Sequence, residues 1–178
     1  MKSDPNADLL PGEWAVLGVI AQMPAHGFAV ARELAPTGAL GRVWTMSRPR
    51  VYRAVSDLAA RGLIESRAEE GSDRGPARVV YAVTDAGSAR LERWLSTPVE
   101  HIRDVRSDLL LKLALLDRAG RSPRALLEAQ RTRLGSLPGA LEAAGTDADG
   151  FDVVVLRYRV SSARAVLEFV DELLATAT

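Results

Sequence analysis

The stretch TMSRPRVYRAVSDLAARG, from Thr45 to Gly62, carries the clearest local pattern of the chain, that of a short amphipathic helix. Ser47 suits the N-cap, because its hydroxyl can accept a hydrogen bond from a backbone N–H that a helix start leaves unpaired. Pro49 then falls in the first turn, where proline is tolerated. At about 3.6 residues per turn, the apolar side of this helix carries Val51, Val55, Leu58, Ala59 and Gly62.

The outward side of the same helix is polar and rich in arginine. It carries Pro49, Arg53, Ser56, Asp57 and Ala60, with Arg50 and Tyr52 on the two flanks. Arginine, serine and tyrosine at the start of a helix can contact phosphates and base edges when the helix lies in a DNA major groove. An ordinary solvated surface helix has the same pattern, so this segment alone leaves both interpretations open.

Two helices are expected before this one, and two strands after it. Apolar residues fill most of 13–23, which indicates a helix buried on most sides and ended by Pro24. A second helix is expected over 26–35, with a buried stripe of Phe28, Val30, Ala31 and Leu34. Strands are expected over 63–69 and 77–84, joined by the turn GSDRGP. Three helices followed by a β-hairpin is the order of a winged helix-turn-helix, whose third helix enters the major groove.

Arginines of the expected hairpin, or wing, are placed to meet phosphate. Arg74 lies at its tip and Arg78 at its base. In the alternative, Arg67 and Arg78 pair with the acidic residues of the hairpin, which are Glu65, Glu69 and Glu70. Between residues 42 and 78 there are eight arginines and five acidic residues, a modest local excess in a chain of zero net charge.

Three motifs in this order carry a family resemblance. HGFAVARELAP, MSRPRVYRAVSDLAARGLIE and GPARVVYAVTDAG together resemble the PadR family of bacterial transcriptional regulators, over roughly residues 9–100. The helical remainder is similar in character to the C-terminal domain of the longer PadR-like proteins. The chain departs from the family pattern at Phe28, where tyrosine is usual, and at Ser47-Arg48-Pro49, where Ser-Pro-Gly is usual.

The resemblance implies a dimeric repressor that binds an inverted-repeat operator and releases it when a small aromatic or hydrophobic effector binds. On that pattern Tyr52 contacts phosphate, while Arg50 lies near base edges or the backbone. The residues expected to contact DNA are Ser47, Arg48, Arg50, Tyr52, Arg53, Arg74 and Arg78. A different class of function stays open, that of a winged-helix module which holds a protein partner and does not bind DNA.

The C-terminal part is expected to be all helical and to hold the dimer together. Thr84 can cap a fourth helix that ends at Thr97-Pro98, so the expected domains are 1–97, which binds DNA, and 98–178, which dimerises. Leucines occupy almost every face of 104–121, Ser122-Pro123 opens a further helix, and Pro138 should split it. The last helix, 151–175, has two adjacent apolar stripes, one for its own domain and one for a symmetry mate.

Two tryptophans near the expected domain junction are candidates for effector binding. Trp94 lies one turn before Pro98, and Trp14 lies on a helix with more apolar surface than one small core needs. Pockets favour such junctions. The alternative is that both indoles simply belong to the core.

Composition excludes several other classes of protein. The chain has no cysteine and only two histidines, His26 and His101, so neither a disulfide framework nor a zinc site is expected. No serine or carboxylate pair has the spacing of a nucleophile with its base, and GTDADG at 145–150 lacks the acidic residue that would complete a calcium loop. We therefore expect no enzyme, no cofactor and no metal, in a protein of the cytoplasm without membrane segments. His26, beside a glycine at a helix start, is expected to have a capping or packing role.

Overall fold

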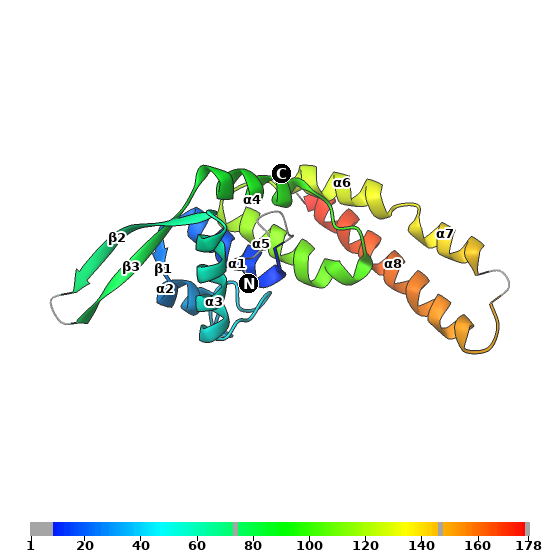
Figure 1. Cartoon of the computed structure of the whole chain (residues 1–178). Helices are drawn as coiled ribbons and strands as arrows, with labels where there is room; N and C mark the ends of the chain where they lie inside the picture. The colour runs from blue at the N-terminus through cyan, green and yellow to red at the C-terminus, as the bar shows by residue number, and fades with distance from the viewer. Residues whose placement is uncertain (1–8, 73–74, 146–147, 177–178) are drawn as a thin grey trace. The chain divides into compact units, whose positions relative to one another are not determined.

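The computed structural model describes residues 9–72, 75–145 and 148–176. For residues 68–72 and 75–78 it describes the backbone alone. The chain divides into two compact units, Met1–Trp94 (unit 1) and Leu95–Thr178 (unit 2) (Figure 1). The boundary expected from the sequence lies a few residues later, after residue 97. Within the described residues, no helix has both the length and the apolar character needed to cross a membrane.

Unit 1 contains the helices and the hairpin of a winged helix, and a further short strand. Its elements are α1 (Pro11–Gln22), β1 (Ala25–His26), α2 (Gly27–Glu33), α3 (Arg48–Ala60), β2 (Ile64–Ser72), β3 (Gly75–Val83) and α4 (Asp85–Ser96). The strands form one antiparallel sheet in the order β1-β3-β2, and β2 and β3 project together from the helices (Figure 1). The prediction of a mainly helical fold with a small hairpin is confirmed.

Strand β1 was not predicted, and the hairpin is longer than predicted. Ala25 pairs with Tyr81 and His26 with Val80, so β1 adds a third strand at the edge of β3. Two residues are too few to give an alternating pattern, which is why the sequence does not reveal this strand. The strands extend into the turn expected at 71–76, because β2 continues to Ser72 and β3 begins at Gly75.

The core of unit 1 follows the expected apolar pattern except at Phe28. Helix α1 is buried along Glu13–Ile20, and Val30, Ala31 and Leu34 are buried around α2. Phe28 was predicted to be buried and is 41% exposed. The reason is that α2 begins at Gly27, with His26 as its N-cap: the Nδ1 atom of His26 accepts a hydrogen bond from the Ala29 N–H at 3.0 Å. Phe28 therefore stands in the first turn, on the outer side, and the expected capping role of His26 is confirmed.

Helix α3 begins where the sequence predicts, but without the predicted capping hydrogen bond of its N-cap side chain. Ser47 is the N-cap residue with an extended backbone, yet its side chain makes no capping hydrogen bond, so the predicted role of its hydroxyl is wrong. Pro49 lies in the first turn as expected. The buried face comprises Val51, Ala54, Val55 and Leu58.

The end of α3 depends on the backbone of Gly62 rather than on an apolar contact. Gly62 has φ +68°, its N–H donates to Ala59 O at 2.9 Å, and the Leu63 N–H donates to Leu58 O at 3.0 Å. These two bonds are those of a Schellman C-cap, in which a left-handed residue turns the chain out of the helix and satisfies its last carbonyls. Glycine adopts this conformation without the steric penalty of a Cβ.

Gly62→Ala is expected to lower the free energy of unfolding by about 1 kcal/mol, because a Cβ would strain the left-handed backbone. An added Cβ would meet no atom within 4 Å, so crowding contributes nothing to this loss. Gly139→Ala is the matched control, since Gly139 lies inside α7, has no positive φ and also has open space around it. Urea unfolding should show the control as stable as the parent or more stable. Equal stability of the parent and Gly62→Ala would contradict the prediction.

Unit 2 is all helical. A short 3₁₀ turn (Ile102–Asp104) and a π-helical turn (Val105–Leu109) lead into α5 (Leu110–Arg118), followed by α6 (Arg124–Leu134), α7 (Leu137–Ala144) and α8 (Gly150–Thr176). Helices α6 and α7 both run along α8 (Figure 1). The predicted split near Pro138 is confirmed, since α6 ends at Leu134 and Pro138 lies in the first turn of α7.

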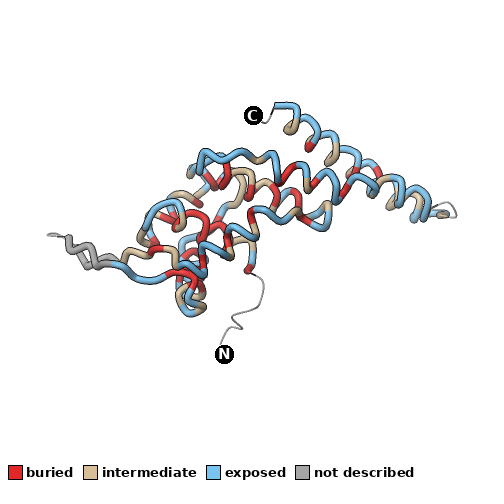
Figure 2. Tube along the Cα trace, turned by 90° about the horizontal axis from the view of Figure 1, so that it is seen from above, coloured by how far each residue is buried: buried red, intermediate tan, exposed pale blue. Residues whose placement is uncertain are grey.

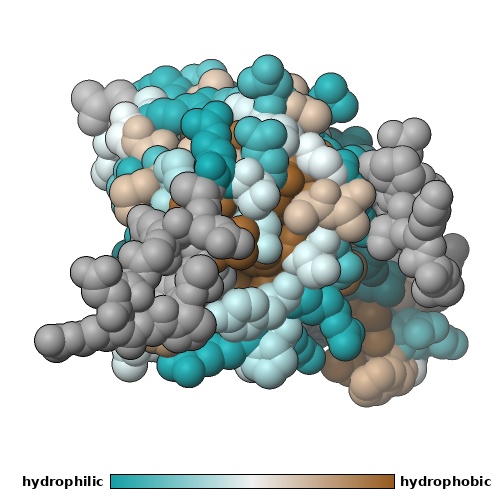
Figure 3. Space-filling view, turned by 60° about the vertical axis from the view of Figure 1, so that its left-hand side comes forward, coloured by the Kyte–Doolittle hydropathy of each residue, from teal (hydrophilic) through white to brown (hydrophobic). Residues whose placement is uncertain are grey.

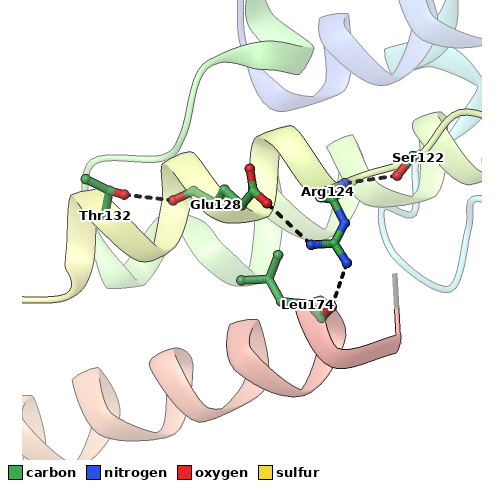
Figure 4. A network of polar contacts seen from close by, with 5 residues as sticks. All are labelled: Ser122, Arg124, Glu128, Thr132 and Leu174. Carbon is green, nitrogen blue, oxygen red and sulfur yellow. Dashed lines mark hydrogen bonds and ion pairs between the residues drawn. The ribbon is translucent and has the colours of Figure 1, made fainter. Parts of the chain in front are cut away.

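Arg124 links the start of α6 to the end of α8. Its guanidinium donates to Glu128 Oε1 and to the carbonyl oxygen of Leu174, each at 3.4 Å (Figure 4). The carbonyls at the end of a helix have no partner within the helix, so an arginine is a suitable donor for them. The Arg124 N–H also donates to the hydroxyl of Ser122 at 3.4 Å, so the predicted pair Ser122-Pro123 does begin this helix.

Two buried polar side chains tie the segment after α4 into unit 2. The amide of Gln130, which is fully buried, accepts from the Val99 N–H at 2.7 Å and donates to the Val99 carbonyl at 3.0 Å. Lys112 Nζ donates to the carbonyl of Thr97 at 2.5 Å, and burial lowers the pKa of Lys112 to about 8. Burial likewise raises the pKa of Asp108, one turn earlier. Residues 97–99 are thus an ordered part of unit 2 rather than a loose linker.

Helix α8 buries part of one apolar stripe and exposes several apolar side chains elsewhere on its surface. Val160, Ala163 and Val170 of the first stripe are buried (Figure 2). On the other side of the helix Tyr158 is 73% exposed and Val154 54% exposed. This second surface, which we call the outer stripe, consists of Phe151, Val154, Val155, Tyr158, Ser162, Val166, Phe169 and Leu173.

Candidate nucleic-acid interface

The first turns of α3 present three arginines to solvent. Arg48, Arg50 and Arg53 are all exposed, and Tyr52 is 51% exposed. The predicted residues Ser47, Arg48, Arg50, Tyr52 and Arg53 are therefore all exposed around the N-terminal half of α3, with Arg50 and Arg53 on one flank and Arg48 and Tyr52 on the other, and the first turn holds no acidic residue. In the view that turns the hairpin side of unit 1 forward, hydrophilic side chains surround a small hydrophobic area (Figure 3).

Two aromatic rings belong to the same surface. The guanidinium carbon of Arg48 lies 4.9 Å from the centroid of the Phe28 ring. Tyr52 lies against Gly27, since a Cβ added there would stand 2.7 Å from Tyr52 Cε1. The first turn of α2 and the start of α3 are therefore in direct contact. The sequence missed Phe28 as a surface residue because its spacing from Val30 and Ala31 fits a buried stripe.

A buried ion pair fixes α3 against α1. Arg61, at the C-cap of α3, has its Nη2 atom 3.6 Å from Glu13 Oε1, and both side chains are about nine-tenths buried. The other oxygen of Glu13 accepts a hydrogen bond from the Leu10 N–H at 2.7 Å. A cation at the C-terminus of a helix is also favoured by the helix dipole. The arginine-bearing helix is thus anchored at its far end, and its exposed first turns have a fixed orientation within unit 1.

The wing is only partly described. Arg74 lies outside the described residues, and so does the side chain of Arg78, although the backbone of Arg78 in β3 pairs with that of Glu70 in β2. Arg67 Nε lies 3.6 Å from Oε1 of Glu65, two residues earlier on β2, and both side chains are well exposed. An exposed pair of this kind contributes little to stability. Arg67 is therefore ion-paired, but along β2 and not across the hairpin as the alternative expected. The phosphate contacts of Arg74 and Arg78 stay predictions.

The two candidate effector residues, Trp14 and Trp94, lie together in unit 1. Their rings are stacked, with centroids 4.7 Å apart and planes 10° from parallel. Trp14 is buried and Trp94 is partly exposed. One face of each indole is thus used by the other, so a planar ligand would meet the remaining face of Trp94 or displace one ring.

The described residues offer no obvious metal centre. They contain no group of three or more His, Asp or Glu side chains placed to hold a metal ion. His26 is occupied as the α2 cap, and His101 precedes the 3₁₀ turn of unit 2.

Thr84 has the capping role that the sequence predicts at the start of α4. Its hydroxyl accepts a hydrogen bond from the Gly87 N–H at 3.1 Å and donates one to the Gly62 carbonyl oxygen at 2.7 Å.

Comparisons with known proteins point to one family. Residues 16–93 match the family described as "Transcriptional regulator PadR-like family". A protein of Mycobacterium tuberculosis described as a "Probable transcriptional regulator" is 26% identical over 96 residues, which are 54% of this chain and 49% of that protein, so the match spans about half of the relative's length.

Solved structures that this chain resembles are less similar in sequence. Bacillus subtilis PadR in complex with operator DNA is 18% identical and covers 92% of this chain and 97% of its own, with a TM-score of 0.47. PadR of the same organism in complex with p-coumaric acid is 17% identical, with coverages of 96% and 98% and a TM-score of 0.41.

Proposed function

We propose that this protein, whose residues 16–93 match the PadR-like family of transcriptional regulators, is a sequence-specific DNA-binding regulator that acts as a repressor. The observation that carries the proposal is the exposure of Arg48, Arg50 and Arg53 on the first turns of a helix whose far end is anchored by the Glu13–Arg61 pair. Rigid placement matters, because a helix reads base edges only when its side chains arrive in a fixed register.

Each side chain has a distinct part in the proposed complex. Arg50 and Arg53 reach base edges in the major groove, where an arginine can donate two hydrogen bonds to guanine O6 and N7. Tyr52 donates to a phosphate and fixes the register of the helix. Arg74 and Arg78 of the wing lie against the phosphates beside the groove, while Ser47 and Arg48 contact DNA at the helix start.

A homodimer through unit 2 is the second part of the proposal. A two-fold dimer presents two copies of α3, so the operator is an inverted repeat with half-site centres about one helical turn, or a small multiple, apart. The support within the chain is the outer stripe of α8, on which no residue is buried and Phe151, Val154 and Tyr158 are exposed.

Selection of duplexes from a random pool, followed by binding at several salt concentrations, tests the DNA-binding function. We expect an enriched inverted-repeat motif, and an affinity whose logarithm falls linearly with the logarithm of salt, with a slope of about −0.9 per phosphate contacted. A winged-helix module that holds a protein partner predicts no enriched motif and little dependence on salt. That result would replace the proposed function by this alternative.

The release of DNA by a small aromatic or hydrophobic effector completes the proposal. Its support is the stacked pair of Trp14 and Trp94, of which Trp94 keeps part of its surface open. An effector can shift the protein off the operator only by binding more tightly to the DNA-free arrangement, and by linkage the operator then weakens effector binding to the same extent.

Titration with small aromatic acids and planar hydrophobic drugs should quench tryptophan emission and lower operator affinity together. Trp44→Phe gives the clearest background, because the chain has only three tryptophans and the stacked pair then supplies all of the emission. In that background Trp94→Ala should fold normally, judged by circular dichroism, and lose the response. An unchanged effector affinity in Trp94→Ala would rule out this site.

A further inference from the structure

Phe28 is an exposed aromatic ring that the fold of unit 1 does not require. It is 41% exposed and lies outside the fully buried core, which is formed around α2 by Val30, Ala31 and Leu34. Its ring instead has the guanidinium of Arg48 above it, 4.9 Å from the centroid. Phe28 stands in the first turn of α2 and Arg48 is the first residue of α3, so the contact joins two helix starts that are far apart in sequence.

The contact of Arg48 with the Phe28 ring is a cation–π contact, which engages the charge of the guanidinium and needs no hydrogen-bond acceptor. A guanidinium is planar, and all of its N–H donors lie in that plane, so a ring that packs on its face leaves the donors open to other partners. Arg48 is therefore held in place and can still donate a fork of two parallel N–H groups. Such a fork fits two acceptors on DNA, the O6 and N7 atoms of guanine and a pair of phosphate oxygens.

The neighbours of Phe28 keep its ring in position. His26 caps α2 through the Ala29 N–H, which fixes the backbone on either side of Phe28, and the His26 ring lies 6.2 Å from the Phe28 ring. Tyr52, one turn after Arg48 on α3, lies against the buried Gly27. Of the three exposed arginines on α3, Arg48 is the one with an aromatic ring beneath it in the described part of the chain.

We propose that Phe28 is a positioning residue, which orders the Arg48 guanidinium on its ring so that Arg48 donates a hydrogen-bonded fork to DNA. The inference rests on the proposed DNA-binding function and deepens it, because it adds a residue of α2 to the recognition surface. Without the ring, Arg48 keeps its charge and loses its orientation. In the parent protein Phe28 and Arg48 act as one unit, so Phe28 affects DNA binding only through Arg48.

A double-mutant cycle on duplexes selected by the parent protein tests this. Phe28→Ala and Phe28→Leu should each weaken binding roughly tenfold, the size expected for a partly desolvated cation–π contact, while Phe28→Tyr should bind like the parent because it keeps the ring. In the Arg48→Ala background, Phe28→Ala should cause no further loss. Urea unfolding of every variant accompanies the cycle, since a merely structural role of Phe28 would weaken binding whether or not Arg48 is present.

Random duplexes of the same length distinguish the two acceptors. If the fork meets guanine, Phe28→Ala lowers operator affinity more than affinity for random DNA, and a selection repeated with the variant loses one guanine per half-site. If it meets phosphate, both affinities fall alike.

Binding of Phe28→Leu at the level of the parent, or an undiminished effect of Phe28→Ala in the Arg48→Ala background, would overturn the inference and leave the proposed function intact. If the parent selects no motif and binds no duplex, the proposed function fails first, and the inference fails with it.

Discussion

Val154→Asp combined with Tyr158→Asp is expected to convert the protein from a dimer to a monomer. Both residues lie on the outer stripe of α8, and they are 54% and 73% exposed in the single chain. In the proposed dimer each is buried against the symmetry mate, where a carboxylate loses its hydration and faces a second carboxylate across the two-fold axis. Losing the burial of two such side chains should raise the dimer dissociation constant by about 100-fold or more.

Ala125→Asp is the control, because Ala125 is exposed on α6, away from the outer stripe, and gains the same carboxylate. Sedimentation over a range of concentrations should show the control as a dimer and the double variant as a folded monomer with reduced operator affinity. A double variant that remains dimeric at the same concentration would show that α8 is not the dimer contact.

Arg50→Ala and Arg53→Ala are each expected to lower operator binding by about 1 to 3 kcal/mol. Both side chains are exposed on the first turns of α3, which the Glu13–Arg61 pair holds in place. An arginine that donates to a guanine edge contributes to specific binding more than to binding of random DNA. The ratio of the two affinities should therefore fall in each variant.

Arg42→Ala and Tyr52→Phe are the controls for these two substitutions. Arg42 is an exposed arginine outside α3, so its loss should leave the ratio of operator to random affinity unchanged. Tyr52→Phe keeps the ring that lies against Gly27 and removes only the hydroxyl, so it should weaken binding to every sequence alike. Parent-like operator binding by both Arg50→Ala and Arg53→Ala would show that α3 is not the helix that reads DNA.

The sequence by itself determined the helices whose signals lie within a few neighbouring residues. Pro49 and the apolar repeat of Val51, Val55 and Leu58 located α3, and Thr84 located the start of α4. Pro138 located the break between α6 and α7. Hydrogen bonds within a helix, proline geometry and the facing of side chains three and four apart are all local, so a single chain segment carries the information.

Contacts between segments distant in the chain were decided by the tertiary structure alone. No local pattern predicts the pairing of β1 with β3 or the ion pair of Arg61 with Glu13. The stacking of the Trp14 and Trp94 rings is equally absent from any local pattern. Phe28 is the most consequential case, since its spacing predicts burial and the packing of α2 against α3 instead places it under Arg48. The physical reason is that such contacts depend on how elements pack, and packing partners have no fixed separation in sequence.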